Sequence, residues 1–223
     1  MVKDKLVFFF KSEDDLPGKG VKEHINIITK YEKLSQIKDW RKMLSDFYIH
    51  PFIVDEEEWL TVDHFVHACK FRKLQDPNYY KYYKTFTSNG GEIWSKDPTL
   101  AWFAGQAGKK TREGNKYNSA KLYNKVPQNI DPRPDFTSRN IDKKAMTIAR
   151  FAKFSQNKEL KNVLLETNDA DLFHLIMHKD KPSEDKLSEC LISVRETIRA
   201  HEPFCDIADI SKFSKETINE ILN

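Results

Sequence analysis

The chain has 223 residues, of which 39% are hydrophobic and 12% aromatic, so it can bury a core as one large domain or two small ones. Lys and Arg exceed Asp and Glu by 37 − 34 = +3, which excludes an argument from charge alone for a nucleic-acid or membrane partner. Cys69, Cys190 and Cys205 are widely spaced, and the apolar run Leu6 to Phe10 is too short for a signal peptide or membrane span. We therefore expect a cytoplasmic or nuclear protein that keeps its thiols.

The first third of the chain predicts a strand, a helix and a hairpin. "KLVFFFKS" is rich in strand formers, and Asp14 to Gly20 then breaks the chain with one proline and two glycines. From Thr29 to Leu44 apolar residues recur at three- and four-residue steps, which predicts an amphipathic helix. Tyr48 to Leu60 alternates around a proline and an acidic tip, as an edge hairpin does.

Helices dominate the middle of the chain. Thr61 is an N-cap candidate for a helix running to about Leu74. The segment "PNYYKYYKTF" places Tyr79, Tyr83 and Phe86 on one helical face, which favours core packing over base stacking. A further helix is expected near Asp97 and Pro98.

The remaining elements are also expected to be helical. Ile141 to Leu165 has helical spacing, "TNDADLFHLI" is interpreted as a capped helix start, and Leu187 to Ile198 is amphipathic. The segment "DISKFSKETINEIL" predicts a last helix. Together these elements predict a mainly α-helical α+β single domain with a small sheet, formed from the N-terminal strand and the Tyr48 to Leu60 hairpin.

The stretch "WLTVDHFVHACKF" carries the most chemistry. Because each helical residue turns by about 100 degrees, Asp63, His67 and Lys70 share one face. The carboxylate could stabilise positive charge on a sugar carbon, and the amine could act as a nucleophile or a general acid. Taken singly, Asp63 is explained by the helix dipole and Lys70 by solvation, so spacing alone favours a structural interpretation.

Three other polar features are weaker. His64 and His67 lack the H-E-x-x-H pattern and a third ligand, so no metal site is expected, and Cys69 is interpreted as a core residue. The basic loop "GKKTREGNK" could meet phosphate through Lys109 and Lys110, although it lacks the features of a P-loop and is interpreted as solvated.

The order of motifs adds a resemblance. "FFFKSEDDLPGKG", "YEKLSQIKDWRKMLSDF", "WLTVDHFVHACKF", "SKDPTLAWFAGQAGKK", "IARFAKFSQNKELKNVLLETNDADLFHL" and "LISVRETI" together resemble the NADAR family, the YbiA-like domains named for NAD and ADP-ribose. The likeness is to the longer form with the "PGKG" opening and spans Phe8 to Arg199. It implies a domain over residues 1–200 and a helical extension over 201–223.

The resemblance implies cleavage of N-glycosidic bonds, without a metal or redox cofactor. The expected reaction is hydrolysis of the ribose C1–N bond of ADP-ribosyl-guanine in DNA or RNA. The alternatives are a phosphoribosyl N-glycosidase that acts on riboflavin-pathway intermediates and a degenerate module that binds ADP-ribose or a nucleotide. A pure protein-interaction module is a further alternative. No membrane partner is expected, and the oligomeric state is left open.

The site residues follow from motif positions. The family's Leu-Ser-Asn-Phe motif matches Leu44 to Phe47, its Thr-Val-Glu-His motif matches Thr61 to His64, and its helix-closing lysine matches Lys70. The resemblance makes Asp63 the carboxylate that stabilises an oxocarbenium-like sugar and Lys70 the amine that captures the opened sugar as a Schiff base. The candidate substrate-binding residues are Arg41, Ser45, Asp46, Phe47, Trp59, His64, His67, Lys109 and Lys110.

Three positions depart from the family pattern. Asp63 is one methylene shorter than the usual glutamate, Asp46 replaces an asparagine, and Trp102 takes the place of a lysine in the segment that follows Asp97 and Pro98. These departures motivate the alternative of binding without cleavage.

Overall fold

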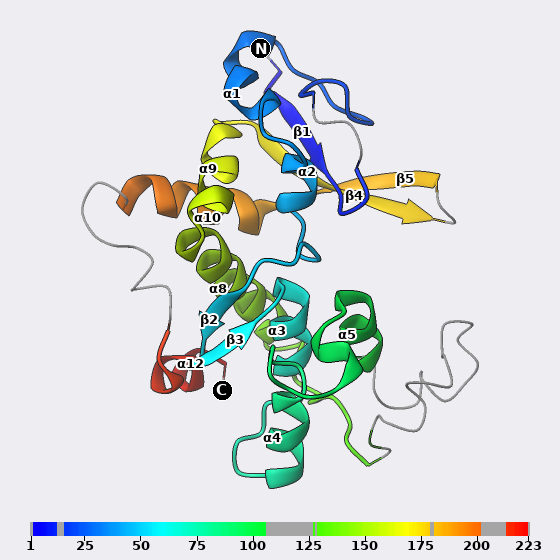
Figure 1. The fold of residues 1–223 in the computed structure, drawn as a ribbon, viewed down its shortest axis with the longest axis vertical. Coiled ribbons are helices and arrows are strands. Elements are labelled where there is room, and N and C mark those ends of the chain that lie inside the picture. Colours follow the sequence, from blue (N-terminus) through cyan, green and yellow to red (C-terminus); the bar gives the residue numbers. More distant parts are fainter. Residues whose placement is uncertain are drawn as a thin grey trace. The chain divides into compact units, whose positions relative to one another are not determined.

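The structure is a computed structural model that describes residues 2–12, 16–105, 127, 129–178, 181–201 and 213–222 (Figure 1). The described residues divide into two compact units, each assembled from two stretches of the chain. Unit 1 takes its residues from Met1–Tyr48 and Arg150–Ser211, and unit 2 from Ile49–Ala149 and Lys212–Asn223. Helices predominate and two small sheets accompany them, so the predicted α+β class is confirmed.

Unit 1 is built on a three-stranded sheet. The strands are β1 (Lys5–Phe8), β4 (Asp171–His178) and β5 (Lys181–Leu187), in the order β1-β4-β5. Strand β1 runs parallel to β4 with Lys5 opposite Asp171, and β5 runs antiparallel to β4. The central strand therefore joins two segments that lie far apart in the sequence.

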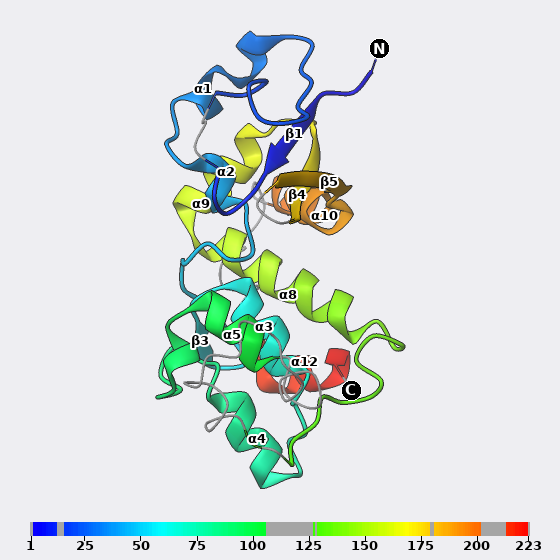
Figure 2. The same ribbon diagram turned by 90° about the vertical axis from the view of Figure 1, so that its right-hand side faces the viewer.

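Helices pack beside this sheet (Figures 1 and 2). They are η1 (Ile28–Tyr31), α1 (Glu32–Ser35), α2 (Trp40–Met43), α9 (Lys158–Glu166), α10 (Glu189–His201) and the C-terminal part of α8 (Ile141–Gln156). Their buried side chains form one core with the strands, including Leu6, Phe8, Trp40, Phe154, Leu160, Leu164, Leu172, Leu191 and Ile198.

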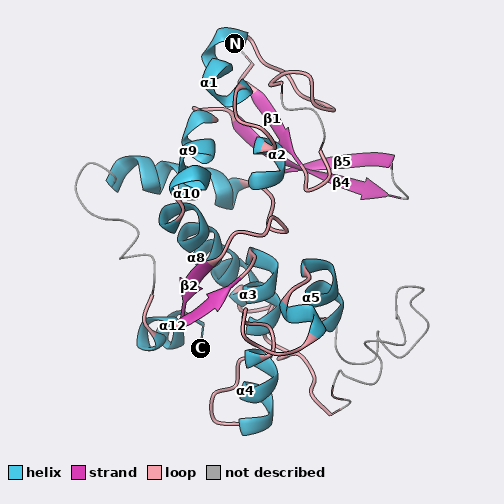
Figure 3. Cartoon of the chain, in the orientation of Figure 1, coloured by secondary structure: helices cyan, strands magenta, loops and turns pink. Residues whose placement is uncertain are grey.

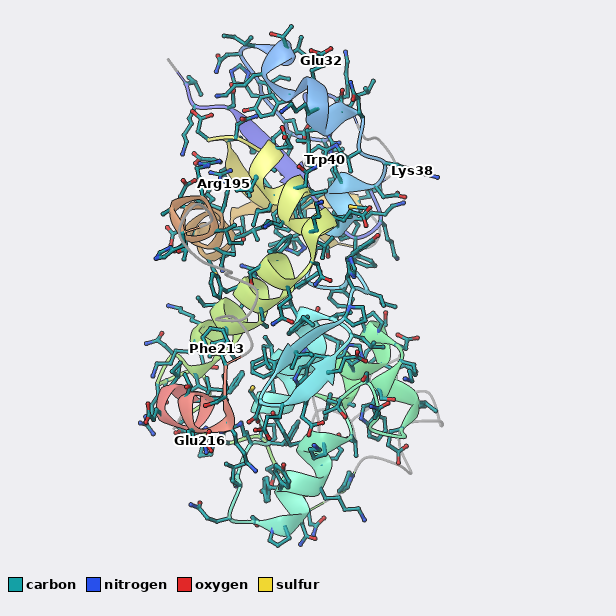
Figure 4. All side chains as sticks on the ribbon, turned by 60° about the vertical axis from the view of Figure 1, so that its left-hand side comes forward. Glu32, Lys38, Trp40, Arg195, Phe213 and Glu216 are labelled. Atoms are coloured by element: carbon teal, nitrogen blue, oxygen red, sulfur yellow. The ribbon has the colours of Figure 1, made fainter. Side chains whose placement is uncertain are left out.

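A buried arginine ties α10 to the entry of β4. Figure 4 labels Arg195 on α10, whose Nη1 donates to the Thr167 hydroxyl and to the Ala170 carbonyl, both at 2.9 Å. Trp40 on α2, also labelled, is fully buried in the same core. The hydrogen bonds of Arg195 hold the second chain stretch of unit 1 together, and Trp40 adds a side chain of the first stretch to the shared core.

Unit 2 contains the predicted hairpin, β2 (Phe52–Val54) and β3 (Glu57–Trp59), drawn in magenta in Figure 3. Asp55 and Glu56 at its tip have φ values of 59° and 60°, which suit a two-residue turn between antiparallel strands. The other elements are α3 (Val62–Cys69), α4 (Pro77–Lys84), η2 (Ile93–Ser95), α5 (Pro98–Ala104), α12 (Lys215–Leu222) and the N-terminal part of α8.

Aromatic rings fill the core of unit 2. Trp59 meets Phe65 and Tyr83 edge-on, with ring centroids 5.1 and 5.4 Å apart. Phe71 and Phe86 belong to the same buried set. The predicted core packing is confirmed for Tyr83 and Phe86, which are fully buried, but not for Tyr79, which is only partly buried.

The helix predicted over "PNYYKYYKTF" and the helix predicted near Asp97 both begin with a capping aspartate. The Asp76 side chain accepts from two backbone N–H groups at the start of α4, and Asp97 does the same for α5. Each helix has proline at its first position, where the missing N–H costs no hydrogen bond. These local signals are therefore sufficient to position both helices.

The last helix belongs to unit 2. Asp55 N–H donates to the Phe213 carbonyl at 3.2 Å, just before α12 begins, and Ile218 and Leu222 are buried. Figure 4 labels Phe213 and Glu216 in this segment. The division of the chain into a domain over 1–200 and an extension over 201–223 stays a prediction.

The predicted sheet is wrong in its pairing. The N-terminal strand does not pair with the Tyr48–Leu60 hairpin but with β4, in the segment "DLFHLIMH" for which the sequence predicted a helix start. The Asn and Asp residues before β4 resemble a helix cap, yet they form a turn in which Asn168 has a φ of 52°. Strand pairing over a long sequence distance overrides this local signal.

Two predicted helices are each interrupted. The Thr29–Leu44 helix is broken into η1, α1 and α2, because Asp39 adopts the left-handed region with a φ of 60°. The Ile141–Leu165 helix is divided at Asn157, which is extended with φ −115° and ψ 107°. In the described parts of the chain, no helix combines the length and apolar character needed to cross a membrane.

Candidate functional site

The start of α3 is held by Thr61, as predicted. The Thr61 hydroxyl oxygen accepts from the backbone N–H of His64 at 3.3 Å, which satisfies a donor that the first turn leaves without a partner. The helix ends at Cys69 and not near Leu74, because the N–H groups of Phe71 and Arg72 turn back three residues, to Ala68 and Cys69. The shorter helix leaves Lys70 as its C-cap residue.

The predicted polar face of α3 is present. The Nε2 atom of His67 lies 3.6 Å from Oδ1 of Asp63, one helical turn away. Lys70 follows on the same face, and its Nζ donates to the Gly105 carbonyl at 3.1 Å. The structure therefore brings Asp63, His67 and Lys70 together within unit 2.

The amine of Lys70 is unusually easy to deprotonate. Burial lowers its pKa from 10.5 to about 8, although the nearby carboxylate of Asp63 acts in the opposite direction. Its Nζ also lies 5.9 Å from the centre of the Phe136 ring. A lysine in this state carries a useful fraction of neutral, nucleophilic amine near neutral pH.

His67 is a neutral neighbour of this pair. The side chain is 6% exposed, and burial, followed by the charge of Lys70, holds its pKa well below 6.5. The contact with Asp63 is therefore polar but not a salt bridge. The Nδ1 atom has no hydrogen-bond partner among the described residues. Gly105 packs against the ring so closely that a Cβ there would lie 2.4 Å from Nδ1.

His64 and Trp59 hold the structure of unit 2. His64 is fully buried, with Nδ1 2.7 Å from the Thr61 hydroxyl and Nε2 2.9 Å from the Trp94 carbonyl. The carbonyl can only accept, so Nε2 carries the proton and the Thr61 hydroxyl donates to Nδ1. The Trp59 indole is fully buried and donates to the Val54 carbonyl. Neither side chain is exposed to a ligand.

In unit 1 the candidate residue Asp46 lies in an ion pair. Arg150 on α8 donates to both carboxylate oxygens of Asp46, at 2.9 and 2.7 Å, and to the Ser188 hydroxyl at 3.2 Å. Burial raises the pKa of Asp46, but the charge of Arg150 and its hydrogen bonds outweigh that effect and lower it. The negative charge is therefore matched by a fixed cation.

Ser45 and Phe47 flank this pair in the turn after α2. Ser45 is buried, its hydroxyl accepts from the Phe47 N–H, and its carbonyl accepts from Lys153 at 2.8 Å. The Phe47 ring is only partly buried and stacks on Phe10 at 5.1 Å. The partly buried ring of Phe47 can contact a ligand, whereas the buried side chain of Ser45 cannot.

Arg41 lies against a small cavity in unit 1. Its guanidinium pairs with Glu23 at 2.6 Å and stacks over Trp40 at 4.1 Å. The cavity has a volume of about 210 Å³, and Lys11 and Lys19 line it as well. Three cations therefore line one cavity, and the charge of Arg41 is partly matched by Glu23.

The remaining candidate positions add little. Lys109 and Lys110 lie outside the described residues. Trp102, at the position where the pattern that the sequence resembles has a lysine, is 38% exposed on α5. Within the described ranges, no three His, Cys, Asp or Glu side chains come together as they would around a metal ion. Cys69 is buried in the core, as predicted, and burial raises the pKa of its thiol.

Arg150 and Lys153 were not among the residues chosen from the sequence. Both are at least 94% buried on α8, at 6% and 0% exposure. The sequence contains a signal for them, because two cations lie three residues apart on the apolar side of the helix. The other buried residues on that side include Ile148, Ala149 and Ala152. Charged side chains at such positions need partners, and those partners are Asp46 and the Ser45 carbonyl.

Comparison with known proteins shows the fold alone. No family model and no curated protein matches the chain. Comparison with solved structures shows a YbiA-like fold over most of the chain. The matching structure is the NMR structure of the Escherichia coli protein YbiA, with a TM-score of 0.55, 16% sequence identity, and coverage of 92% of this chain and 90% of that chain.

Proposed function

We propose that the chain is an N-glycosidase that hydrolyses the ribose C1–N bond of an ADP-ribosylated base, namely ADP-ribosyl-guanine in nucleic acid. The observation that carries the proposal is the face of α3, where the carboxylate of Asp63 and a lysine amine with a pKa of about 8 lie together. The YbiA-like fold and the motif resemblance support it.

The residues of α3 suit the bond that must break. When the C1–N bond breaks, its electron pair leaves with the base and positive charge develops on C1 and the ring oxygen. The carboxylate of Asp63 stabilises that charge. The neutral amine of Lys70 attacks C1 as the base leaves, and a proton of the amine passes to the departing base. The bond between C1 and the ring oxygen then opens, the second amine proton passes to that oxygen, and a Schiff base forms. One water hydrolyses the Schiff base, releasing the sugar and the free amine.

Unit 1 by itself holds groups that suit a nucleotide ligand. Lys11, Lys19 and Arg41 around one cavity can pair with a diphosphate, and the Phe47 ring can stack on a base or ribose. Because Arg150 matches the charge of Asp46, that carboxylate does not repel a phosphate as an isolated one would.

The test is release of ADP-ribose from DNA that carries ADP-ribosylated guanine. We expect turnover by the parent chain and none by Lys70→Ala, while Lys81→Ala on the exposed face of α4 keeps the parent rate. Borohydride added during turnover should trap the sugar on Lys70, which peptide mass spectrometry detects. No release by the parent chain would contradict the proposal.

A second candidate is a module that binds ADP-ribose without cleaving it. It is favoured by Asp63, whose side chain is one methylene shorter than the glutamate of the family pattern, since a displacement of about 1 Å can cost on the order of a hundredfold in rate. Calorimetry with ADP-ribose that shows binding, together with no release from DNA, would select this candidate. Asp63→Glu should then create activity.

The substrate base is tested in the same assay. Phosphoribosylated pyrimidine intermediates replace the modified DNA in parallel reactions, and the released sugar phosphate is measured. If only these compounds are turned over, the substrate is a phosphoribosylated pyrimidine and not ADP-ribosyl-guanine. The proposed roles of Asp63 and Lys70 would not change.

A further inference from the structure

A tight turn in unit 1 carries one of the lysines that line the cavity of about 210 Å³. It runs from Leu16 to Lys19, and the Lys19 N–H donates to the Leu16 carbonyl at 3.1 Å. Pro17 stands at its second position and Gly18, with a φ of 82°, at its third. These are the features of a type II turn, whose third position favours glycine because it requires a positive φ. The turn therefore fixes the backbone that carries Lys19.

The carboxylate of Glu23 holds this turn against strand β1. Its side chain is 0% exposed. The Oε2 atom accepts from the N–H groups of Gly18 at 2.8 Å and Gly20 at 3.0 Å, and Oε1 accepts from the N–H of Val7 on β1 at 2.8 Å. Because Val7 belongs to the strand and Gly18 to the turn, this one carboxylate joins the two segments.

Arg41 on α2 holds the same turn from its carbonyl side. Its Nη2 donates to the Leu16 carbonyl at 2.9 Å and to Oε2 of Glu23 at 2.6 Å. The guanidinium also lies over the Trp40 ring, 4.1 Å from its centre. Hydrogen bonds to charged groups are stronger than those between neutral groups. Glu23 and Arg41 together therefore hold the turn through both its N–H and its carbonyl groups.

Two lysines at the cavity are open to solvent. Lys19 belongs to the turn and Lys11 to the segment that follows β1, and both line the cavity. Both are exposed, and within the part of the chain that the structure describes neither amine forms an ion pair. A lysine amine is a point charge on a flexible stem, so the separation of the two amines depends on how their backbone segments are held. Glu23 is bonded to both the turn and β1, and it therefore controls that separation.

We propose that Glu23 is a positioning residue for phosphate binding in unit 1, where it holds the turn so that Lys19 and Lys11 meet the same phosphate group. The inference rests on the part of the proposed function that binds a phosphate-containing ligand in this cavity, and not on the cleavage step. The negative charge of Glu23 by itself opposes an anion. If Glu23 supplied only charge, neutralising it would tighten phosphate binding. Because it positions the turn, neutralising it weakens phosphate binding.

The test is calorimetric titration of the full chain and of Glu23→Gln with ADP-ribose. Glutamine keeps the size of the side chain, but its NH₂ group cannot accept a hydrogen bond. We expect the dissociation constant to rise roughly two- to fivefold, about the contribution of one exposed lysine. Glu32→Gln, at an exposed acid on α1 that Figure 4 labels, makes the same change in charge and should leave the dissociation constant unchanged. An equal or lower dissociation constant for Glu23→Gln would overturn the proposal.

A double-mutant cycle separates positioning from a general loss of stability. In the background of Lys19→Ala, Glu23→Gln should no longer weaken ADP-ribose binding, because the amine that Glu23 positions is gone. Equal weakening in both backgrounds would show that Glu23 does not act through Lys19 and would overturn the proposal.

Gly20→Ala is a second variant, which keeps the charge of Glu23. A Cβ at this position would lie 2.7 Å from the carboxylate carbon of Glu23 and 2.9 Å from Nε of Arg41, so it displaces both side chains. It should weaken ADP-ribose binding as Glu23→Gln does, and unchanged binding would overturn the proposal.

The outcomes for Glu23 and for the glycosidase can be told apart. Absence of ADP-ribose binding by the parent chain, or binding that Lys19→Ala does not weaken, overturns the role of Glu23, while the release assay alone decides the cleavage. Binding with the expected effects of the variants, but without release from modified DNA, supports the role of Glu23 and contradicts the glycosidase.

Discussion

Lys70 illustrates how position changes the chemistry of an ordinary side chain. In the sequence it is a lysine at the end of a helix, for which a solvated amine is the expected state. In the structure it is partly buried, donates to the Gly105 carbonyl, and its pKa is lowered to about 8. Burial, and not a catalytic neighbour, is the main cause, since Asp63 acts to raise the pKa.

This pKa predicts how the glycosidase rate depends on pH. The attacking amine must be neutral, so kcat/KM should rise about tenfold per pH unit below 8 and level off above it. Asp63→Asn removes the influence that raises the pKa, so any residual activity should have its inflection at lower pH. Measured pH profiles check both statements. A profile that is flat through pH 8 would contradict the role of Lys70 as a nucleophile.

The burial of His64 predicts that pH affects the free energy of unfolding through this residue, and not the activity. Burial lowers its pKa from 6.5 to about 4, so the folded chain keeps the imidazole neutral while the unfolded chain takes up a proton first as pH falls. The contribution of neutral His64 to the free energy of unfolding is fully present above pH 6.5. It is lost as the pH falls from 6.5 to 4. At about 1.4 kcal/mol per pKa unit it amounts to about 3 kcal/mol.

Urea unfolding of the chain and of His64→Asn, at a series of pH values, measures this effect. His64→Asn should lose the part of the dependence that His64 contributes and keep the part from His67 and His174, whose pKa values burial also lowers, at the cost of lower stability throughout. The exposed residue His24 provides the control, since His24→Asn should keep it. An unfolding free energy that is constant from pH 6.5 to 4 would show that His64 is protonated in the folded chain.

At the scale of elements, α3 and α5 pack through a glycine. Gly105 has a φ of −67°, which any residue adopts, so its backbone alone does not require glycine. A Cβ there would, however, lie 2.4 to 2.6 Å from three atoms of His67. The close approach is what allows the Gly105 carbonyl to accept from Lys70.

Gly105→Ala should therefore lower the unfolding free energy by about 1 to 3 kcal/mol and reduce activity by displacing His67 and Lys70. Because the Cβ of His67 is itself one of the three close atoms, only its removal makes room, so the double variant Gly105→Ala/His67→Gly should be no less stable than His67→Gly alone. Chemical denaturation of the four proteins forms a double-mutant cycle. Additive effects would show that His67 is not the side chain in contact.

The elements also show where sequence signals are reliable. Thr61, Asp76 and Asp97 each cap the helix that the sequence predicted, because a cap acts through neighbouring backbone groups. The same capping signal before "DLFHLI" is misleading, since that segment pairs with β1 as a strand. The helix breaks at Asp39 and Asn157 carry no proline or glycine signal either.

At the scale of the whole molecule, both compact units are assembled from separated stretches of the chain. Unit 2 includes α12, near the C-terminal end, with Ile218 and Leu222 buried and Arg133 donating to the Leu222 carbonyl at 2.9 Å. The last helix therefore contributes to the unit that holds Asp63 and Lys70.

Ile218→Ala should lower stability by about 2 to 5 kcal/mol, the usual range for truncating a buried isoleucine. Hydrogen exchange should show faster exchange in α3 and α4 than in β4, because only the former share a unit with α12. Ile28→Ala, at a residue 62% exposed, is the matched control. It should leave both the unfolding free energy and the hydrogen-exchange rates unchanged. Equal acceleration in all elements would show that the two units unfold as one.

The candidate site was predicted in part. The face with Asp63, His67 and Lys70 follows from helical spacing, because residues three and four apart are neighbours on any helix. The burial of His64 and Trp59 and the ion pairs of Asp46 with Arg150 and of Glu23 with Arg41 could not be read in this way. Each depends on residues more than ten positions apart in the sequence.

The sequence by itself determined the α+β class, the capped helix starts, the hairpin and the polar face of α3, since all of these depend on residues within a few positions of one another. Only the tertiary structure decided that the N-terminal strand pairs with "DLFHLIMH", that α12 packs in unit 2, and that the pKa of Lys70 falls to about 8. Strand pairing and burial depend on contacts between distant segments of the chain. The spacing of neighbouring residues does not indicate those contacts.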